Sequence, residues 1–333
     1  MAMFTLDELG AAHALVGQSM RATPTLGWPL LSARLGTKVF VKHENHGPIG
    51  AFKLRGGLVY VNRLRRRRPD VNGVISATRG NHGQSIAFAA RRSGLAATIV
   101  VPHGNSSEKN AAVRALGAEL IEAGEDFQEA REEALRLAAA RGLEMVPSFH
   151  PDLVLGVATY ALELFAEQPD LDRLYVPIGL GSGICGCIAA RDALGLKTEI
   201  VGVQAAGAPA YALSFDAGRV VTTPHADTLA DGMATRSPHA EAVDIIRRGA
   251  LRIALVSDDE IAAAVRAYWT DTHNLAEGAG AAALAAALQE HTSLAGKRVG
   301  LVLSGGNIDL ALFQRWIAGA AQKTSPVLEP LIG

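Results

Sequence analysis

Alternation of short apolar runs with longer alanine-rich helical stretches is the feature that most limits what this chain can fold into. Seven runs have the character of buried strands, at 38–43, 73–77, 97–101, 119–121, 174–177, 200–203 and 299–304. Helical patterns lie at 81–93, 107–116, 126–141, 186–193 and 258–269, and most open with Ser, Asp or Asn, which cap free backbone N–H groups. Strands that alternate with helices build parallel sheets. The sequence therefore predicts an α/β fold with open, twisted, mostly parallel sheets flanked by helices.

This alternating pattern falls into two blocks along the chain. A chain of 333 residues is long enough to bury two cores. Residues 67–146 form one strand–helix series that ends at Pro147, and a second series begins near Leu174. No internal repeat or low-complexity linker lies between them. We therefore expect two α/β units.

The charge balance and the cysteines argue against several classes of function. A formal net charge of −1 gives no electrostatic reason to expect nucleic acid or a membrane surface as a partner. The basic run 65–68 follows an apolar-periodic stretch and precedes a proline, as the solvated end of a helix does. Cys185 and Cys187 are too close for an ordinary disulfide, and no further cysteine completes a zinc site. Because no leader-like segment and no run of about 18 apolar residues occurs, we expect a cytoplasmic protein without a membrane partner.

Lys53 has the most unusual surroundings of the seven lysines. It lies in the stretch Gly-Pro-Ile-Gly-Ala-Phe-Lys-Leu-Arg-Gly-Gly, at 47–57, between apolar residues and after a turn-forming set. A lysine in an apolar pocket loses its preference for the charged form, and a neutral amine is what attacks a carbonyl group. The others have polar neighbours and are expected to be solvated: Lys38, Lys42, Lys109, Lys197, Lys297 and Lys323. Lys53 is therefore the candidate nucleophile.

Two glycine-rich turns each follow a predicted strand and open a helix. They are Thr-Arg-Gly-Asn-His-Gly-Gln at 78–84 and Gly-Leu-Gly-Ser-Gly at 179–183, and a third turn, Ser-Gly-Gly-Asn at 304–307, follows the last predicted strand. Backbone N–H groups at the start of a helix bind anions. A dinucleotide-binding turn belongs in the first strand–helix unit, with an acid about 20 residues on. Here the turn lies near the middle of the chain and Glu199 precedes its strand, so a plain phosphate site is favoured.

Taken in order, these motifs resemble one enzyme family. The stretch 51–56 (Ala-Phe-Lys-Leu-Arg-Gly), then 80–84, 179–183 and 304–307 are similar to the motifs of the fold-type II pyridoxal-phosphate enzymes, which have a tryptophan synthase β-like fold. The nearest branch resembles threonine dehydratase and serine racemase, and smaller agreements lie at 23–24, 229–232 and 277–280. The resemblance spans roughly residues 20–315. It implies a large cofactor-binding domain of residues 1–66 and 147–333, a small mobile domain of residues 67–146, ligands in the cleft between them, and a homodimer.

The resemblance also implies a role for each site residue. Lys53 would hold pyridoxal phosphate as a Schiff base and act as the base at the substrate Cα. Phe52 would pack against the cofactor ring, and Asn81 would form a hydrogen bond with its phenolic oxygen. Ser304 would face the ring nitrogen, and Glu277 would lie beside the ring. Backbone N–H groups would hold the phosphate at Gly179, Leu180, Gly181, Ser182 and Gly183. The substrate would contact Thr78, Arg79, Gly80, Asn81 and His82, of which Arg79 could instead be an exposed arginine paired with an acid or with the cofactor phosphate.

The activity implied is β-elimination of the hydroxyl group from a small β-hydroxy-α-amino acid, which yields a 2-oxo acid and ammonia. Another β-elimination, a β-replacement and a racemisation stay open as alternatives. The Gly-Thr-Gly-Gly-Thr loop and the lysine motif of cysteine synthase relatives are absent. A non-catalytic cofactor-binding or amino-acid-binding protein is a further alternative, and the presence of Lys53 argues against it.

Four departures from the family pattern affect these expectations. Ala51 replaces a serine that dehydratases commonly carry. Arg79 stands where serine racemase has the serine that acts on the opposite face of Cα, and an arginine stays protonated, so racemisation is disfavoured. Gln204 and Ala210 replace the two acids of the branch's divalent-cation site, so we expect no metal there. The segment 150–159 is about four residues shorter than usual and borders the entrance, so we expect a change in the accepted substrate size.

Overall fold

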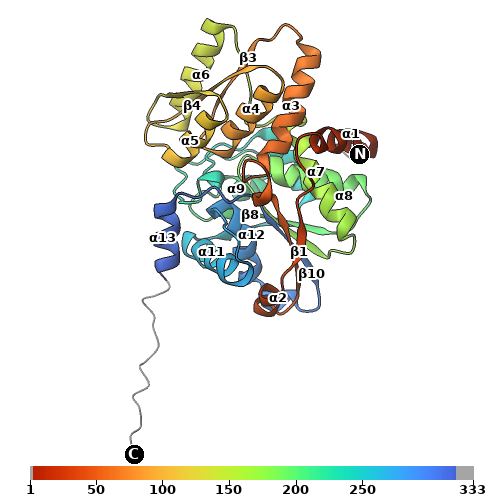
Figure 1. Cartoon of the computed structure of the whole chain (residues 1–333). Coiled ribbons are helices and arrows are strands. Elements are labelled where there is room, and N and C mark those ends of the chain that lie inside the picture. The colour runs from red at the N-terminus through yellow and green to blue at the C-terminus, as the bar shows by residue number, and fades with distance from the viewer. Residues whose placement is uncertain (1–2, 320–333) are drawn as a thin grey trace, which may run out of the picture.

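The computed structural model describes residues 3–319, which form two sheets (Figure 1). The larger sheet has the strand order β1-β2-β10-β7-β8-β9, and the smaller has the order β5-β4-β3-β6. Every pair is parallel except β1 with β2. The predicted α/β fold with mostly parallel sheets is confirmed. The predictions for residues 1–2 and 320–333, including Lys323, lie outside the described residues.

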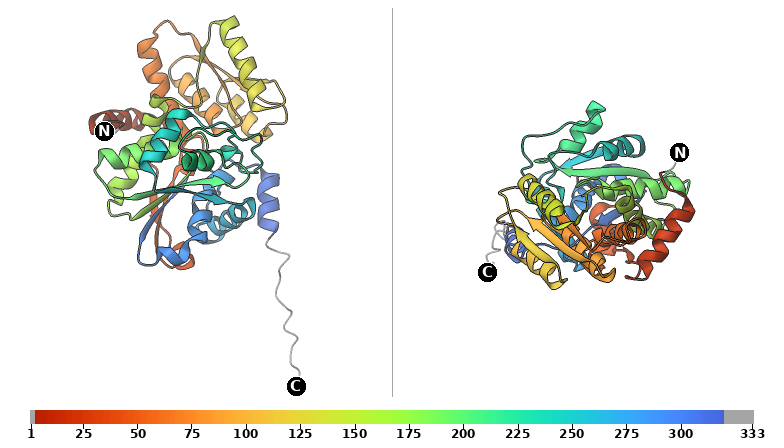
Figure 2. Two further views of the ribbon diagram at one scale, coloured as in Figure 1. Left: turned by 180° about the vertical axis from the view of Figure 1, so that it is seen from behind. Right: turned by 90° about the horizontal axis from the view of Figure 1, so that it is seen from above.

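The four-stranded unit lies at the top of Figure 1 and of the left view in Figure 2. Its strands are β3 (Gly73–Ala77), β4 (Ala96–Val101), β5 (Glu119–Glu122) and β6 (Glu144–Met145), and its helices are α4 (Asn81–Arg92), α5 (Ser107–Ala115) and α6 (Phe127–Arg141). Helix α6 covers β3 and β4 with an apolar stripe that includes Ala130, Ala134 and Leu137. Spacings of three and four residues place these side chains on one helix face, which makes a small separate core.

The six-stranded unit contains the other described elements, apart from α3 (Lys53–Arg67). Its strands are β1 (Thr25–Gly27), β2 (Lys38–His43), β7 (Arg173–Pro177), β8 (Glu199–Ala205), β9 (Arg252–Val256) and β10 (Arg298–Leu303). Its helices are α1 (Leu6–Gly17), α2 (Pro29–Leu35), α7 (Pro151–Glu167), α8 (Ser182–Ala193), α9 (Ala210–Ala217), α10 (Ala240–Gly249), α11 (Asp258–Thr272), α12 (Gly278–Gln289) and α13 (Leu310–Ala318), with short 3-10 turns η1 (Glu44–His46), η2 (Asp231–Met233) and η3 (His291–Leu294).

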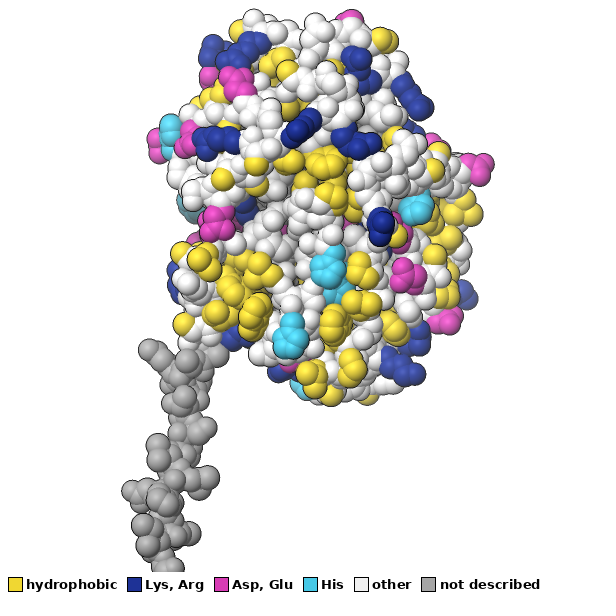
Figure 3. Space-filling view, viewed as in Figure 1, with side chains coloured by type: hydrophobic (Ala, Val, Ile, Leu, Met, Phe, Trp, Pro, Cys, Tyr) yellow, Lys and Arg dark blue, Asp and Glu magenta, His cyan; other side chains and the backbone are white. Residues whose placement is uncertain are grey.

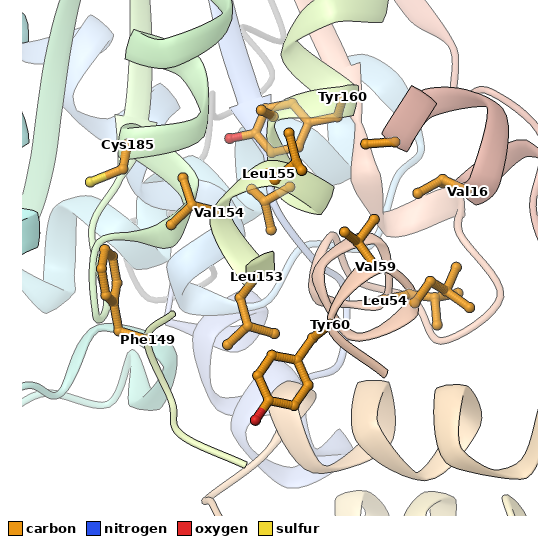
Figure 4. Close-up of a cluster of buried hydrophobic side chains, with 14 of the residues drawn as sticks. Val16, Leu54, Val59, Tyr60, Phe149, Leu153, Val154, Leu155, Tyr160 and Cys185 are labelled. Carbon is orange, nitrogen blue, oxygen red and sulfur yellow. The ribbon is translucent and has the colours of Figure 1, made fainter. Parts of the chain in front are cut away.

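Helix α3 (Lys53–Arg67) packs against both units, on α4 of the smaller one and on α7 of the larger one. Glycines allow the close approach to α7: a Cβ on Gly56 would lie 2.8 Å from the Leu153 carbonyl oxygen, and one on Gly156 would lie 2.2 Å from the Arg55 carbonyl oxygen. The apolar cluster around this contact is drawn in Figure 4. Because α3 starts at Lys53, this packing fixes the position of the candidate nucleophile.

All seven predicted strands and all five predicted helices are present, with shifts at their ends. Helix α8 begins at Ser182, four residues before the predicted start, because the glycine-rich turn itself forms its first turn. Helices α7 and α12 were missed. Both are buried on almost every side, so apolar residues lie all around each helix and the polar face of a surface helix is missing.

The charged residues are distributed as the sequence suggested. Helix α3 ends at Arg67, and Arg66, Arg67 and Arg68 are exposed, which confirms the basic run as a solvated helix end. On the face in Figure 3, the lysine and arginine side chains are scattered over the surface. Within residues 3–319, no helix is both long enough and apolar enough to cross a bilayer.

Candidate active site

The candidate site lies at the carboxyl ends of four strands. Lys53 follows β2 and η1, the turn at 78–84 follows β3, the turn at 179–183 follows β7, and the turn at 304–307 follows β10. In open α/β sheets this is the edge at which ligands bind. Motifs that are far apart in the sequence thus meet where the two units face each other.

Lys53 is the first residue of α3 and its amine points at the 179–183 turn. Its Nζ donates a hydrogen bond to Ser182 Oγ at 3.2 Å and lies 5.0 Å from the centre of the Phe52 ring. The preceding backbone is tied to the end of β10, since Phe52 N donates to the buried Ser304 O at 3.0 Å. Burial lowers the pKa of Lys53 to about 8, against the opposing effect of the Glu277 carboxylate. A neutral amine is therefore accessible near physiological pH.

The turn at 179–183 requires glycine at two of its positions, 179 and 181. Gly181 has φ +94°, and a Cβ there would lie 2.8 Å from the Cβ of Ala242. A Cβ on Gly179 would lie 2.3 Å from the Gly232 carbonyl oxygen. The Leu180 carbonyl oxygen is held from the other side by the Tyr211 hydroxyl at 2.9 Å. The turn opens α8, so its backbone N–H groups and the positive end of the helix dipole face an incoming anion.

Asn81, Glu277 and Asn307 form a chain of hydrogen bonds across the cleft. Asn81 Nδ2 donates to Glu277 Oε1 at 2.7 Å, and Asn307 Nδ2 donates to Asn81 Oδ1 at 2.8 Å. Burial raises the pKa of Glu277 to about 7, although the Lys109 ammonium opposes this. The second oxygen of Glu277 is buried and has no hydrogen-bond partner within residues 3–319. Glu277 is thus a buried carboxyl group that can lose or keep its proton near neutral pH.

Lys109 joins this cluster, contrary to the expectation of a solvated lysine. It is buried, and its Nζ donates to Asp231 Oδ2 at 2.5 Å and lies 3.7 Å from Glu277 Oε2. Lys42 is also buried, in β2, and its Nζ donates to Glu163 Oε2 at 2.7 Å. The expectation was wrong for both because polar sequence neighbours say nothing about acids that the fold brings in from elsewhere. The exposed Lys38 and Lys197 agree with it.

The turn at 78–84 places its polar groups around the same space. Thr78 Oγ1 accepts a hydrogen bond from Gly80 N at 3.0 Å, and a Cβ on Gly83 would lie 2.6 Å from Thr78 Cγ2. His82 is buried, and burial together with the Lys53 charge lowers its pKa to about 3. Its Nε2 has no hydrogen-bond partner among the described residues. His82 is therefore a neutral imidazole at physiological pH.

Arg79, in the same turn, is exposed and lines a cavity of about 230 Å³ between the two units. The cavity also reaches Lys109, Asp231, Glu277 and Asn307. It is bounded by residues of both sheets, so a molecule entering it comes into contact with the hydrogen-bonded cluster described above.

Comparison with known proteins identifies the family of this chain. Residues 16–305 match the family model described as pyridoxal-phosphate dependent enzyme. The chain belongs to this family. Its cofactor is pyridoxal phosphate, as the resemblance implied.

The relatives point to one branch of this pyridoxal-phosphate family. L-threonine ammonia-lyase of Geobacter sulfurreducens is 40% identical over 281 residues, which cover 84% of this chain and 69% of that protein. L-threo-3-hydroxyaspartate ammonia-lyase of Saccharomyces cerevisiae is 33% identical over 314 residues, which cover 94% and 96%. The structure of maize serine racemase matches with a TM-score of 0.88 at 26% identity, over 96% of this chain and 98% of that one. The predicted threonine dehydratase and serine racemase branch and the fold-type II architecture are confirmed.

The residues present fit the cofactor. An aldehyde needs an amine with a low pKa, which Lys53 supplies. A phosphate needs close approach to backbone N–H groups, and the Gly179 and Gly181 positions leave no space for side chains. Ser182 Oγ lies beside both features, at 3.2 Å from the lysine amine.

The two positions where the branch carries metal-binding acids have other roles in this pyridoxal-phosphate enzyme. Gln204 Oε1 accepts a hydrogen bond from Ala212 N at 2.9 Å in the first turn of α9, and Ala210 is buried at the start of that helix. Within residues 3–319 no group of three His, Cys, Asp or Glu side chains is arranged to hold a metal ion.

A buried ion network beneath Lys53 was missed by sequence reasoning. Arg55 is fully buried, and its guanidinium donates to Glu44 Oε2 at 2.8 Å and to Glu163 Oε1 at 2.7 Å. Lys42 completes the set, so two cations face two carboxylates. The only sequence signal was an arginine two residues after Lys53 in an apolar stretch, and its partners lie 11 and 108 residues away. The network anchors the first turn of α3.

Proposed function

We propose that this chain removes the hydroxyl group and the α-amino group from a small β-hydroxy-α-amino acid, giving a 2-oxo acid and ammonia. The observation that carries this proposal is the Lys53 amine, with its pKa lowered to about 8, facing the glycine turn at Ser182. Relatives named L-threonine ammonia-lyase and L-threo-3-hydroxyaspartate ammonia-lyase support elimination as the reaction class.

When bound, the cofactor withdraws electrons from the substrate Cα and makes its proton acidic. Lys53 would carry the cofactor and, once displaced by the substrate amine, would take the Cα proton on Nζ. Burial favours this role because an amine with a pKa of about 8 is partly neutral at pH 7. The 179–183 backbone would hold the phosphate, and the Ser304 hydroxyl would face the ring nitrogen.

The cluster around Asn81 would orient the ring and the substrate. Asn81 would donate a hydrogen bond to the phenolic oxygen, in place of the one that it now donates to Glu277. Phe52 would pack on the ring, as its position beside Lys53 Nζ suggests. The α-carboxylate would be bound by the turn that contains Thr78, Gly80 and the neutral His82. A neutral imidazole can donate one hydrogen bond to a carboxylate without adding a charge.

Arg79 disfavours racemisation as the activity. Racemisation needs a second group that exchanges a proton on the opposite face of Cα, and the guanidinium stays protonated. β-Elimination needs only the proton transfer at Lys53 and departure of the hydroxyl group.

We further propose that the enzyme is a cytoplasmic homodimer that acts on a free amino acid, without nucleic-acid or membrane partners. Support comes from the family resemblance and from the net charge of −1. We also propose that residues 67–146 move as a small domain relative to residues 1–66 and 147–333, opening and closing the cleft that Arg79 lines.

The experiment is a panel of serine, threonine and 3-hydroxyaspartate in all stereoisomers, assayed for ammonia and for the 2-oxo acid. The purified protein should absorb in the visible and release both products in equal amounts. Lys53→Ala should abolish the visible band and turnover. Release of neither product from any substrate would overturn the proposal, and a borohydride-reducible adduct in the variant would point to another lysine.

A further inference from the structure

Arg79 is an exposed cation that lines the cavity between the two units. Its guanidinium makes no ion pair within residues 3–319, although three carboxylates line the same cavity. One carboxylate oxygen of each of these acids already accepts a hydrogen bond. Asp231 accepts from Lys109 at 2.5 Å, Glu277 accepts from Asn81 at 2.7 Å, and Asp309 accepts from Ser106 at 2.5 Å. The guanidinium is therefore available to an anion that enters from outside.

Arg79 belongs to the turn at 78–84 and lines the same cavity as two members of the hydrogen-bonded cluster. These two residues are Glu277 and Asn307. The other lysine or arginine that lines the cavity, Lys109, is engaged with Asp231 and Glu277. An arginine presents a planar fork of donors that matches the two oxygens of a carboxylate.

A second exposed arginine lies near Arg79, outside the residues that line the cavity. Arg236, which follows η2 in the larger unit, is exposed and makes no ion pair within the described residues. Asp126, at the start of α6, lies near both arginines. Its pKa is lowered mainly by the Glu129 backbone N–H group, and also by Arg236 and Arg79. Asp126 Oδ1 accepts from the backbone N–H groups of Gln128 and Glu129, so this carboxylate is occupied in capping the helix.

We propose that Arg79 determines substrate preference by binding a second carboxylate on the β-carbon, so that the preferred substrate is a dicarboxylic β-hydroxy-α-amino acid. This inference rests on the proposed elimination activity and adds the substrate class. The α-carboxylate goes to the backbone and side chains of the 78–84 turn, and the β-carboxylate goes to the arginine fork at the cavity mouth. Serine and threonine leave the fork empty.

The turnover experiment compares 3-hydroxyaspartate with serine and threonine in the wild type, Arg79→Ala, Arg79→Lys and Arg91→Ala. Charge-assisted hydrogen bonds make the expected loss of kcat/KM on 3-hydroxyaspartate about tenfold to hundredfold in Arg79→Ala. The kcat/KM for serine and threonine should change by less than about threefold, because these substrates have no β-carboxylate to form the hydrogen bonds with Arg79. Arg79→Lys should lie between, because a lysine keeps the charge and loses the fork. Arg91, exposed at the other end of α4, is the matched control for loss of one positive charge.

A binding experiment separates recognition from turnover. L-aspartate and L-asparagine have nearly the same shape, lack the leaving hydroxyl group, and differ in the charge of the side chain. Their binding to the holoenzyme can be followed by the change in cofactor absorbance. The wild type should bind aspartate more tightly than asparagine, and Arg79→Ala should bind the two equally.

Equal loss for all substrates in Arg79→Ala, or equal binding of aspartate and asparagine by the wild type, would overturn this inference. Turnover of serine and threonine without preference for 3-hydroxyaspartate would overturn it as well, and would leave the elimination activity in place. Absence of turnover on every substrate would instead count against the proposed function, while the absorbance titration with aspartate and asparagine would still test Arg79.

Discussion

Replacing the candidate nucleophile should make the cofactor-free protein more stable. In the folded protein, burial lowers the pKa of Lys53 from its usual 10.5 to about 8. An unfolded chain has the ordinary value, so at neutral pH the folded state bears the cost of a buried ammonium. The difference between 10.5 and 8 corresponds to about 3 kcal/mol. Lys53→Met keeps the length of the side chain and removes the charge, so it should raise the free energy of unfolding at pH 7 by up to about 3 kcal/mol.

The pH dependence of the free energy of unfolding distinguishes the removal of a buried charge in Lys53→Met from a general gain in packing. Below pH 8 the lysine is protonated in both states and the cost is present in full. Between pH 8 and 10.5 the unfolded chain keeps the proton and the folded protein loses it, so the stability of the wild type rises with pH. Above pH 10.5 both states are neutral. The stability gap between Lys53→Met and the wild type should therefore close between pH 8 and 10.5.

The assay is urea denaturation of both cofactor-free proteins at pH 7, 8, 9 and 10, followed by far-ultraviolet circular dichroism. Lys197→Met, at an exposed lysine, is the control and should show no such closing gap. A gap of the same size at all four pH values would refute the argument from burial. So would a Lys53→Met variant that is less stable than the wild type at pH 7.

Three further predictions concern the glycine turn, the metal requirement and the buried ion network beneath Lys53. Gly181→Asp should abolish cofactor binding, because a Cβ at φ +94° would lie 2.8 Å from Ala242 and the carboxylate would repel the phosphate; a yellow, cofactor-saturated variant would show that the phosphate binds elsewhere. Activity should survive dialysis against EDTA, since Gln204 and Ala210 replace the acidic ligands; a loss that Mg²⁺ restores would contradict this. Glu163→Gln should lower the free energy of unfolding by about 3–5 kcal/mol, because Arg55 and Lys42 would lose a shared buried carboxylate. Exposed Glu167→Gln is its control, and equal urea midpoints for the two variants would disprove the argument.

Features that are marked by their immediate neighbours in the chain could be predicted from the sequence. The sequence singles out Lys53 as the candidate nucleophile because apolar neighbours and a glycine-proline turn surround it within ten residues. The glycine-rich turn at 179–183 could be predicted because glycines directly precede a helix, and the positive φ of Gly181 shows why a glycine is needed there. Amphipathic helices such as α6 were found by their period, whereas α7 and α12 were missed because they are buried on nearly all sides.

The sequence by itself determined the α/β class, most of the strands and the glycine turns, and it singled out Lys53 as the candidate nucleophile. Each of these depends on local conformation or on the polarity of neighbouring residues. Only the tertiary structure decided which charges are buried. Lys109 meets Asp231, 122 residues later, and Arg55 meets Glu163, 108 residues later. The same holds for Arg79, which makes no ion pair within residues 3–319, because the fold decides which charges lie beside an arginine. Electrostatic interactions act through space over a few ångströms, and the order of residues along the chain does not contain those distances.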